Sequence, residues 1–529
     1  MKSKYLREGE PFVWCSGAAL ALILLLTFYL LLVIFKNGMG VFWVSPVARL
    51  DMVDGTAYIG EVIQTSENSS GDSRMQLKIA NRDLYSLDFK WVFDKDVDII
   101  TYPKDVLVIE RLEYGNFIGF LSSVYLPDLS VAGDDPFSRL QAGLVDIKRH
   151  HGQMKSLESQ ISDLNYKVER LDHTLAKLRY NNKEHTAEFA AATAAKNTVR
   201  VSFDTLVVKL EALQAAESRN GAVFTDVSGT SITLPLTSIV RLYKPNDLSF
   251  LNKVMLYIQK IWELFFDDPR ESNTEGGLFP AIFGTVMLIV VMAIFSFPLG
   301  VIAGIYLREY ARDGFMVRFV RIAVNNLAGI PSIVYGIFGL AFFVYGIGSS
   351  IDQIFFPEML PAPTFGTGGI LWASLTLGLL TIPVVIVSTE EALGAIPGGL
   401  RESSYALGAT KFQTLTRILI PMASPGIMTG FILAMARAAG EVAPLMITGV
   451  VKLAPSLALD FQYPFFHLDR KFMHLGFHIY DIGFQSPNVE AAKPMVFVTT
   501  LLLLGIVIAL TSTAIVMRNR MKKKFAIAD

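Results

Sequence analysis

The chain has 529 residues, of which 52% are hydrophobic and only 18% are charged. A water-soluble globular chain carries about 25% charged residues, so the composition excludes an ordinary soluble protein. The net charge of −1 says nothing about partners, because it averages very different segments, and we expect no nucleic-acid partner. The single cysteine, Cys15, excludes a disulfide framework and a cysteine-based metal site.

Six apolar runs are long enough to cross a bilayer, which takes roughly 20 residues. They cover residues 12–35, 281–307, 319–347, 366–389, 418–451 and 494–517. The first run is longer than the apolar core of a signal peptide, so we expect an uncleaved span. The predicted fold class is an all-α polytopic membrane protein of six transmembrane helices with a large external insertion.

Lysine and arginine gather between the second and third runs, between the fourth and fifth, and after the sixth. Such residues accumulate on the cytoplasmic side of a membrane. We therefore predict a multi-pass protein of the inner membrane whose termini, residues 1–11 and the basic tail 518–529, are both cytoplasmic. Residues 36–279 then lie outside, in the periplasm of a Gram-negative cell.

The external segment combines two kinds of pattern. Short β-branched and aromatic runs predict a β-rich module over residues 44–125 and 221–243. Between them, at about 137–218, a heptad stripe predicts a coiled-coil helical hairpin that turns between Tyr180 and Thr198. Both a docking arm for an external partner and a structural spacer or self-dimerising stalk agree with this pattern.

The segment RESSYALGATKFQTLTRILIP predicts a short helix, a turn at Gly408 and a second helix from Lys411. It resembles the coupling loop of ABC importer permeases, which has the form E-A-A, three residues, Gly, nine residues, I-x-L-P. The matching positions are Glu402, Ser403, Ser404, Gly408, Ile418 and Pro421. The resemblance implies docking on an ATPase subunit, whereas an ordinary amphipathic interfacial helix is the alternative.

No G-x-x-x-x-G-K-[ST] phosphate loop occurs in the chain. We therefore expect no catalytic residue, no cofactor and a separate ATPase. His474 and His478 stand four residues apart, but no third ligand follows at a telling spacing, so we predict no metal site. An aromatic-rich helix at the outer membrane interface is the favoured interpretation of that segment.

Arg437 and Glu441 lie inside the fifth apolar run. A charge at the centre of a span costs about 2.5–3.5 kcal/mol, so such residues are usually functional and face the bundle interior. At a spacing of four on a helix they can pair. Arginine suits an oxyanion, and the carboxylate can accept a hydrogen bond from a protonated one, which favours hydrogen phosphate over sulfate. A buried ion pair that only fixes packing is the alternative.

The segments ARAAGEVAPLMITG, GTVMLIVVMAIFSFPLGVIAGIYLREYA and NNLAGIPSIVYGIFGL resemble the A-type permease family of phosphate-specific ABC importers. The resemblance implies a permease core over residues 280–517 that translocates phosphate past Arg437 and Glu441, with Asn325, Asn326 and Ser332 as further lining candidates. The implied partners are a second homologous permease, an ATPase dimer, a periplasmic phosphate-binding protein and membrane lipid. A permease for sulfate or molybdate, and a membrane scaffold with a coiled-coil sensor, are the rivals.

Overall fold

The computed structural model describes residues 10–67, 72–127, 135–486 and 489–525. Most of the predicted N-terminal segment and the last four residues of the basic tail lie outside this part. The described residues contain six helices that are long and apolar enough to cross a membrane. These are Phe12–Gly40, Phe279–Tyr310, Ser332–Phe355, Ile370–Gly394, Lys411–Gly440 and Val489–Lys524.

The third span differs from its prediction. Helix α8 (Phe315–Leu327) ends before residues 328–331, and the apolar helix then restarts as α9 (Ser332–Phe338), π-helical η5 (Gly339–Gly348) and α10 (Ser349–Phe355). The single helix predicted over 319–347 is therefore wrong. Pro331 explains the break, because it disfavours a helical conformation at the residue before it.

The fifth span is longer at its start and shorter at its end than predicted. Helix α13 (Lys411–Thr414) continues through π-helical η7 (Leu415–Leu419) into α14 (Ile420–Gly440), and a separate short helix, α15 (Ala443–Thr448), follows. Pro444 disfavours an uninterrupted helix at this point, because it has no N–H for the carbonyl of Gly440 and its ring crowds that carbonyl. The predicted span over 418–451 is thus two helices.

The bundle is held together where small residues let helices approach closely. Helix α7 (Phe279–Ile305) packs along α11 (Ile370–Gly394), and both pack with α14. A Cβ added at Gly304 would lie 2.7 Å from the Cβ of Thr389, which shows how closely the two backbones approach. Apolar side chains from α7, α11, α14 and α15, including Leu288, fill the core between them.

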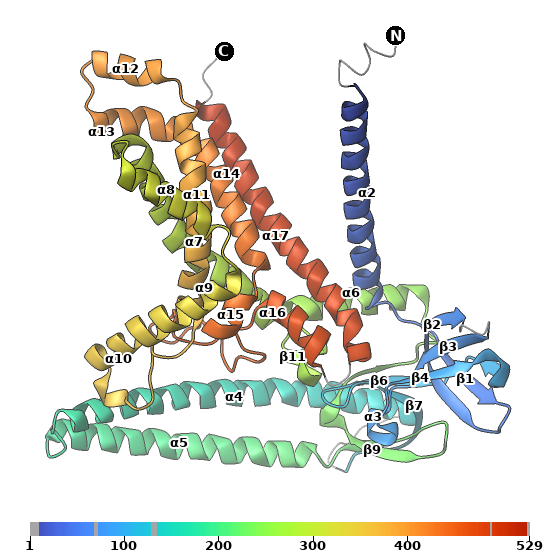
Figure 1. The fold of residues 1–529 in the computed structure, drawn as a ribbon. Coiled ribbons are helices and arrows are strands. Elements are labelled where there is room, and N and C mark those ends of the chain that lie inside the picture. The colour runs from blue at the N-terminus through green and yellow to red at the C-terminus, as the bar shows by residue number, and fades with distance from the viewer. Residues whose placement is uncertain (1–9, 68–71, 128–134, 487–488, 526–529) are drawn as a thin grey trace, which may run out of the picture.

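The two ends of the bundle carry different structures (Figure 1). Helices α12 (Gly398–Ala406) and α13 lie at one end, together with the end of α17 (Val489–Phe525) and the start of α2 (Glu10–Gly40). The sheets and the long helical pair lie at the opposite end. The basic segments thus share one end, as their sequence positions predict, while the side of the membrane that this end faces stays a prediction.

Most of the β-structure forms two antiparallel five-stranded sheets, apart from a small two-stranded one made by β11 (Pro269–Arg270) and β12 (Glu275–Gly276). The first has the order β4-β3-β2-β1-β5 and contains β1 (Val47–Met52), β2 (Ala57–Glu67), β3 (Ser73–Lys78), β4 (Phe89–Phe93) and β5 (Val97–Thr101). The second has the order β10-β6-β7-β8-β9 and contains β6 (Leu107–Arg111), β7 (Phe117–Tyr125), β8 (Gly221–Thr225), β9 (Ser231–Pro235) and β10 (Ile239–Tyr243). We call the two sheets together the β module. Its strands lie within the two stretches where the sequence predicts them.

Two long helices interrupt the second sheet between β7 and β8. Helix α4 (Pro136–Tyr180) and helix α5 (Ala187–Glu217) lie side by side and turn at residues 181–186 (Figure 1). Along the heptad stripe Leu157 and Leu175 are buried and the other members are half-buried. Whether the pair behaves as a coiled coil stays a prediction. Helix α4 also reaches the loops of the bundle, where Gln462 donates to Asp163 at 3.3 Å.

The substitution Gly304→Val should destabilise the bundle, because its side chain would collide with Thr389 and with the carbonyl oxygen of Ile386. Overpacking of this kind costs about 1–3 kcal/mol. The measurement is the thermal unfolding temperature of the detergent-solubilised chain. Gly505→Val is the matched control, since nothing lies within 4 Å of a Cβ there. Equal unfolding temperatures for the two variants would contradict the prediction.

Candidate functional site

Arg437 and Glu441 form an ion pair at the break in the fifth span. The Nε of Arg437 lies 3.7 Å from Oε1 of Glu441, and their side chains are 33% and 22% exposed. Arg437 occupies the last turn of α14, where the negative end of the helix dipole favours a cation. Its guanidinium makes no hydrogen bond to any residue that the structure describes, so the ion pair is a loose one.

The spacing of four residues predicts that Arg437 and Glu441 lie on one continuous helix, but the structure places them on either side of a helix end. Helix α14 ends at Gly440, and Glu441 adopts an extended conformation with φ −83° and ψ 132°. The two charges therefore lie at the end of the span that faces the β module, instead of in its middle. The predicted contact between them is present, although the backbone that holds the carboxylate differs.

The break at Pro444 packs against the start of the third span. A Cβ on Gly336 would lie 2.7 Å from the Cα of Pro444, so α9 and α15 approach closely only because residue 336 is a glycine. Ser332, the first residue of α9, is half-buried and belongs to this same helix. The structure thus brings the helix of Ser332 beside the break that follows Arg437 and Glu441.

Asn325 and Asn326 do not join this group directly. They lie near the end of α8 and are exposed in the described chain. A residue that the sequence analysis overlooked links α8 to α9, because the hydroxyl of Tyr335 donates to the carbonyl oxygen of Leu327 at 2.7 Å. A tyrosine in an apolar run needs such a partner when it is buried, which is the signal that could have found it.

The loop between the fourth and fifth spans forms the predicted helix–turn–helix. Helix α12 is followed by Gly408, whose φ of +82° lies in the left-handed region that glycine favours. Thr410 and Gln413 then form a capping box that starts α13. Of the motif residues, Glu402 and Ser403 are exposed, whereas Ser404 is buried and shares a 2.8 Å hydrogen bond with Thr414.

The end of the motif lies in the span itself. Ile418 is half-buried in η7, and Pro421 stands in the first turn of α14. The helix that begins at Lys411 does not end before the span but continues to Gly440. The wider π-helical turn ahead of Pro421 removes the need for the hydrogen bond that proline cannot donate.

Arg401 anchors this loop to the bundle. It pairs with Glu309 at 2.9 Å and donates to the carbonyl oxygens of Leu393 and Ile396 at 2.7 and 2.9 Å. Beyond the anchor, Leu407 and Phe412 are 89% and 68% exposed. The loop therefore presents apolar side chains from a fixed position, which is an arrangement typical of a protein-binding surface.

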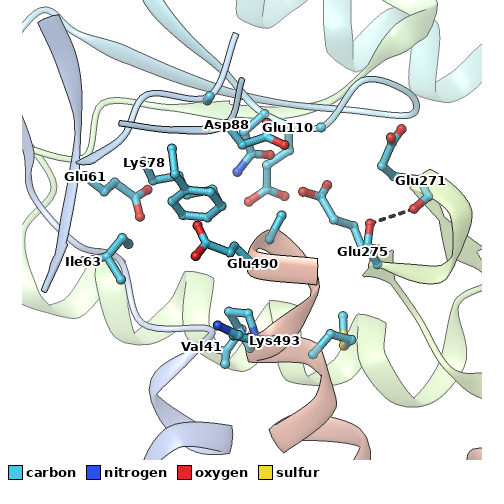
Figure 2. Close-up of a pocket in the computed structure, with 18 of the residues that line it drawn as sticks. Val41, Glu61, Ile63, Lys78, Asp88, Glu110, Glu271, Glu275, Glu490 and Lys493 are labelled. Atoms are coloured by element: carbon cyan, nitrogen blue, oxygen red, sulfur yellow. Dashed lines mark hydrogen bonds between the residues drawn. The ribbon is translucent and has the colours of Figure 1, made fainter. Parts of the chain in front are cut away.

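A cavity of about 500 Å³ lies away from the Arg437–Glu441 pair, between the β module and the ends of α2 and α17 (Figure 2). Charged groups line it, among them Lys78, Glu110 and Glu275. Burial by itself would raise the pKa of Glu110, but the cations Lys260 and Arg241 outweigh burial and hold that pKa below its usual value. Burial raises the pKa of Glu275. No group of three metal-ligating side chains occurs among the described residues.

The two histidines after the fifth span are buried. His478 bonds through its ring nitrogens to Oγ1 of Thr499 at 3.1 Å and to the carbonyl oxygen of Asn273 at 3.0 Å. His474 begins helix α16 (Leu475–Tyr480), where its Nδ1 accepts from the N–H of Gly476. Burial lowers the pKa of both to about 4, so both are neutral near pH 7. The position of this segment at the outer membrane interface stays a prediction.

Comparison with known proteins places the core of the chain. A family model described as the binding-protein-dependent transport system inner membrane component matches residues 296–523. The phosphate transport system permease protein PstA of Pasteurella multocida (strain Pm70) is 31% identical over 246 residues, which cover 46% of this chain and 78% of that protein. The chain belongs to this family of inner-membrane components. The resemblance to ABC importer permeases is thereby confirmed.

Two further comparisons set the limits of this likeness. This chain is 40% identical to the phosphate transport system permease protein PstA of Mycobacterium leprae (strain TN) over 172 residues. These residues cover 32% of this chain and 51% of that protein. The chain thus spans about half the length of this relative. The solved structure of the inward-facing MetNI methionine ABC transporter is 21% identical with a TM-score of 0.34, over 47% of this chain and 96% of that chain. A TM-score this low does not establish a shared fold.

Replacing Arg401 should loosen the loop without unfolding the bundle. In Arg401→Ala the ion pair with Glu309 and two hydrogen bonds to carbonyl oxygens are lost together. We expect faster amide hydrogen exchange over residues 398–410 and unchanged exchange in α7 and α11. Arg417→Ala, at an exposed arginine in the same region, is the control. Unchanged exchange in the loop of Arg401→Ala would show that Arg401 is not its anchor.

Proposed function

We propose that this chain is one transmembrane half of an ATP-driven importer of inorganic phosphate in the bacterial inner membrane. The observation that carries the proposal is the loose Arg437–Glu441 pair within the part of the chain that matches the family model. Relatives named phosphate transport system permease support the choice of substrate. The core would then have the architecture of a type I ABC importer permease.

The chemistry of the pair favours a protonated oxyanion. The guanidinium of Arg437 offers parallel N–H donors that match two oxygens of phosphate. Glu441 neutralises the arginine when no anion is bound, and it accepts a hydrogen bond from the P–OH group of hydrogen phosphate when one is. Sulfate has no proton to donate and is repelled by the carboxylate. Ser332, on the helix packed against this break, is a further candidate for the path, and Asn325 and Asn326 are weaker ones because they lie across the 328–331 turn.

The loop from Glu402 to Pro421 is the proposed contact with a separate ATPase dimer. Leu407 and Phe412 would enter a groove on that subunit, and the continuous helix from Lys411 to Gly440 would carry the motion to Arg437. This chain would bind no nucleotide. A second homologous permease would complete the passage, and a periplasmic phosphate-binding protein would deliver the anion.

The proposed orientation places α12, α13 and both termini in the cytoplasm. The β module and the α4–α5 pair would then lie in the periplasm, and the pair would form a coiled coil. The basic residues at the end of α17 support this orientation, because Lys522, Lys523 and Lys524 lie in its last turn.

Neutralising either charge of the pair should abolish or greatly lower phosphate uptake without loss of assembly. Arg437→Gln removes the anion donor, and Glu441→Gln removes the acceptor for the P–OH proton. The measurement is uptake of radiolabelled phosphate by cells that depend on this chain, with competition by sulfate and molybdate to separate the oxyanions. Arg200→Gln, at an exposed arginine of α5, is the control. Normal uptake in both variants of the pair would remove the proposed site.

Charge placed on the exposed apolar residues of the loop should detach the ATPase. We expect Leu407→Asp and Phe412→Asp each to lower the amount of ATPase that co-purifies with this chain several-fold, because a carboxylate does not enter an apolar groove. Leu112→Asp makes the same change at an exposed leucine of the β module and should have no effect. Unchanged co-purification of all three variants would contradict the proposed contact, whereas failure of the ATPase to co-purify with the unaltered chain would favour the scaffold interpretation.

A further inference from the structure

Helix α6 (Phe250–Phe266) presents an apolar face that nothing in the described chain covers. Along one side of this helix the side chains follow a spacing of three and four residues, and all are large, apolar and exposed. They are Leu251, Met255, Ile258, Trp262, Phe265 and Phe266. A helix on a water-soluble surface shows the reverse pattern, with its polar side outward.

The charged side of α6 points inward, to the β module. Lys260 pairs with Glu110 of β6 at 2.7 Å, and Glu263 pairs with Arg241 of β10. Arg270, just beyond the helix, also pairs with Glu263. These groups lie mostly buried beside the cavity into which Glu110 points (Figure 2). The pairs hold α6 to the sheets and fix which side of the helix is left facing outward.

Both ends of α6 are attached to ends of predicted spans. At its start, Phe250 packs against Trp43, which follows the end of α2, with ring centroids 6.1 Å apart. At its midpoint, the hydroxyl of Tyr257 donates to the carbonyl oxygen of Met39, close to the end of α2, at 3.1 Å, and the Tyr257 ring packs against Trp43. Near its end, the carbonyl oxygen of Leu264 accepts from the N–H of Leu278, one residue before α7 begins, at 2.8 Å.

These attachments fix the direction of the helix. Helix α6 runs crosswise at the end of α2 that faces the β module (Figure 1). A helix that joins the ends of two spans in this way lies in the plane of the membrane surface. Its tryptophan and tyrosine are the residue types that gather at such an interface.

We propose that α6 is a membrane-surface helix whose apolar face is immersed in the lipid leaflet on the side of the β module, and which anchors that module to the bilayer. The occupant of the apolar face is lipid, because α6 is attached to the ends of two spans and runs crosswise at the end of α2 (Figure 1). The ion pairs of Lys260 and Glu263 pass this anchoring to β6 and β10. The proposal does not depend on the transported substrate.

Spin labels on single cysteines test the proposal, since Cys15 is the chain's one native cysteine. In a Cys15→Ser background, the variants Met255→Cys and Ile258→Cys place the label on the apolar face. Asn252→Cys, on the exposed polar flank of the same helix, is the matched control. Ile294→Cys, exposed on α7, and Arg200→Cys, exposed on α5, are the references for lipid and water.

The full chain is reconstituted in nanodiscs of phosphatidylethanolamine and phosphatidylglycerol, and the collision of each label with oxygen and with a water-soluble nickel chelate is measured. We expect the ratio of oxygen to nickel collision at positions 255 and 258 to lie between the ratio at 200 and that at 294, which is deeper in the bilayer than a surface helix. It should be several-fold higher than the ratios at 252 and 200. A water-like ratio at 255 and 258 would overturn the proposal, and so would protection from both reagents, which would place a protein partner on the face.

Discussion

The contact between Gly336 and Pro444 is the constraint on which the core depends. Lipid offers no hydrogen bonds, so a break in a membrane helix is tolerated only where protein covers it or where it lines a cavity. Within the described residues, one such break comes before Ser332 and another after Gly440, and the helices that follow them pack against each other. The Arg437–Glu441 pair stands at the second break for this reason.

One continuous helix joins the two candidate functional regions. It runs for 30 residues, from Lys411 to Gly440, which is about 45 Å at the usual rise per residue. The Gly408 turn and the anchor at Arg401 lie at its first end, and Arg437 lies in its last turn. A movement imposed on the loop therefore has a stiff route to the charged pair, provided that the helix moves as a unit.

The β module is attached to the rest of the chain through charged contacts that are largely buried. Breaking one partner of a buried ion pair leaves an uncompensated charge, which is strongly destabilising. The pairs made by Lys260, Glu263 and Arg270 therefore resist separation of the sheets from α6. The α4–α5 pair makes a second attachment at Gln462, on a loop of the bundle. Further contacts also hold the module, since Gln76 of β3 donates to Glu490 of α17 at 3.1 Å and Arg82 pairs with Glu271 at 3.2 Å.

Sequence alone determined the number of spans, the positions of the strands, the helical pair and the turn at Gly408. These features rest on local patterns: apolar run length, alternation, heptads and the special conformation of glycine. The pairing of Arg437 with Glu441 was also readable, because four residues separate them. The ends of the third and fifth spans could not be predicted from the sequence, because Pro331 and Pro444 are each compatible with a kink or a full break.

Tertiary structure decided everything that depends on residues distant in the chain. Only packing shows that α9 covers the break after Gly440, that Arg401 reaches Glu309, and that His474 and His478 are buried. The apolar side of α6 is readable as a periodic pattern, but its outward direction is not. The buried partners of Lys260 and Glu263, which come from strands far away in the sequence, turn the charged side inward and leave the apolar side exposed.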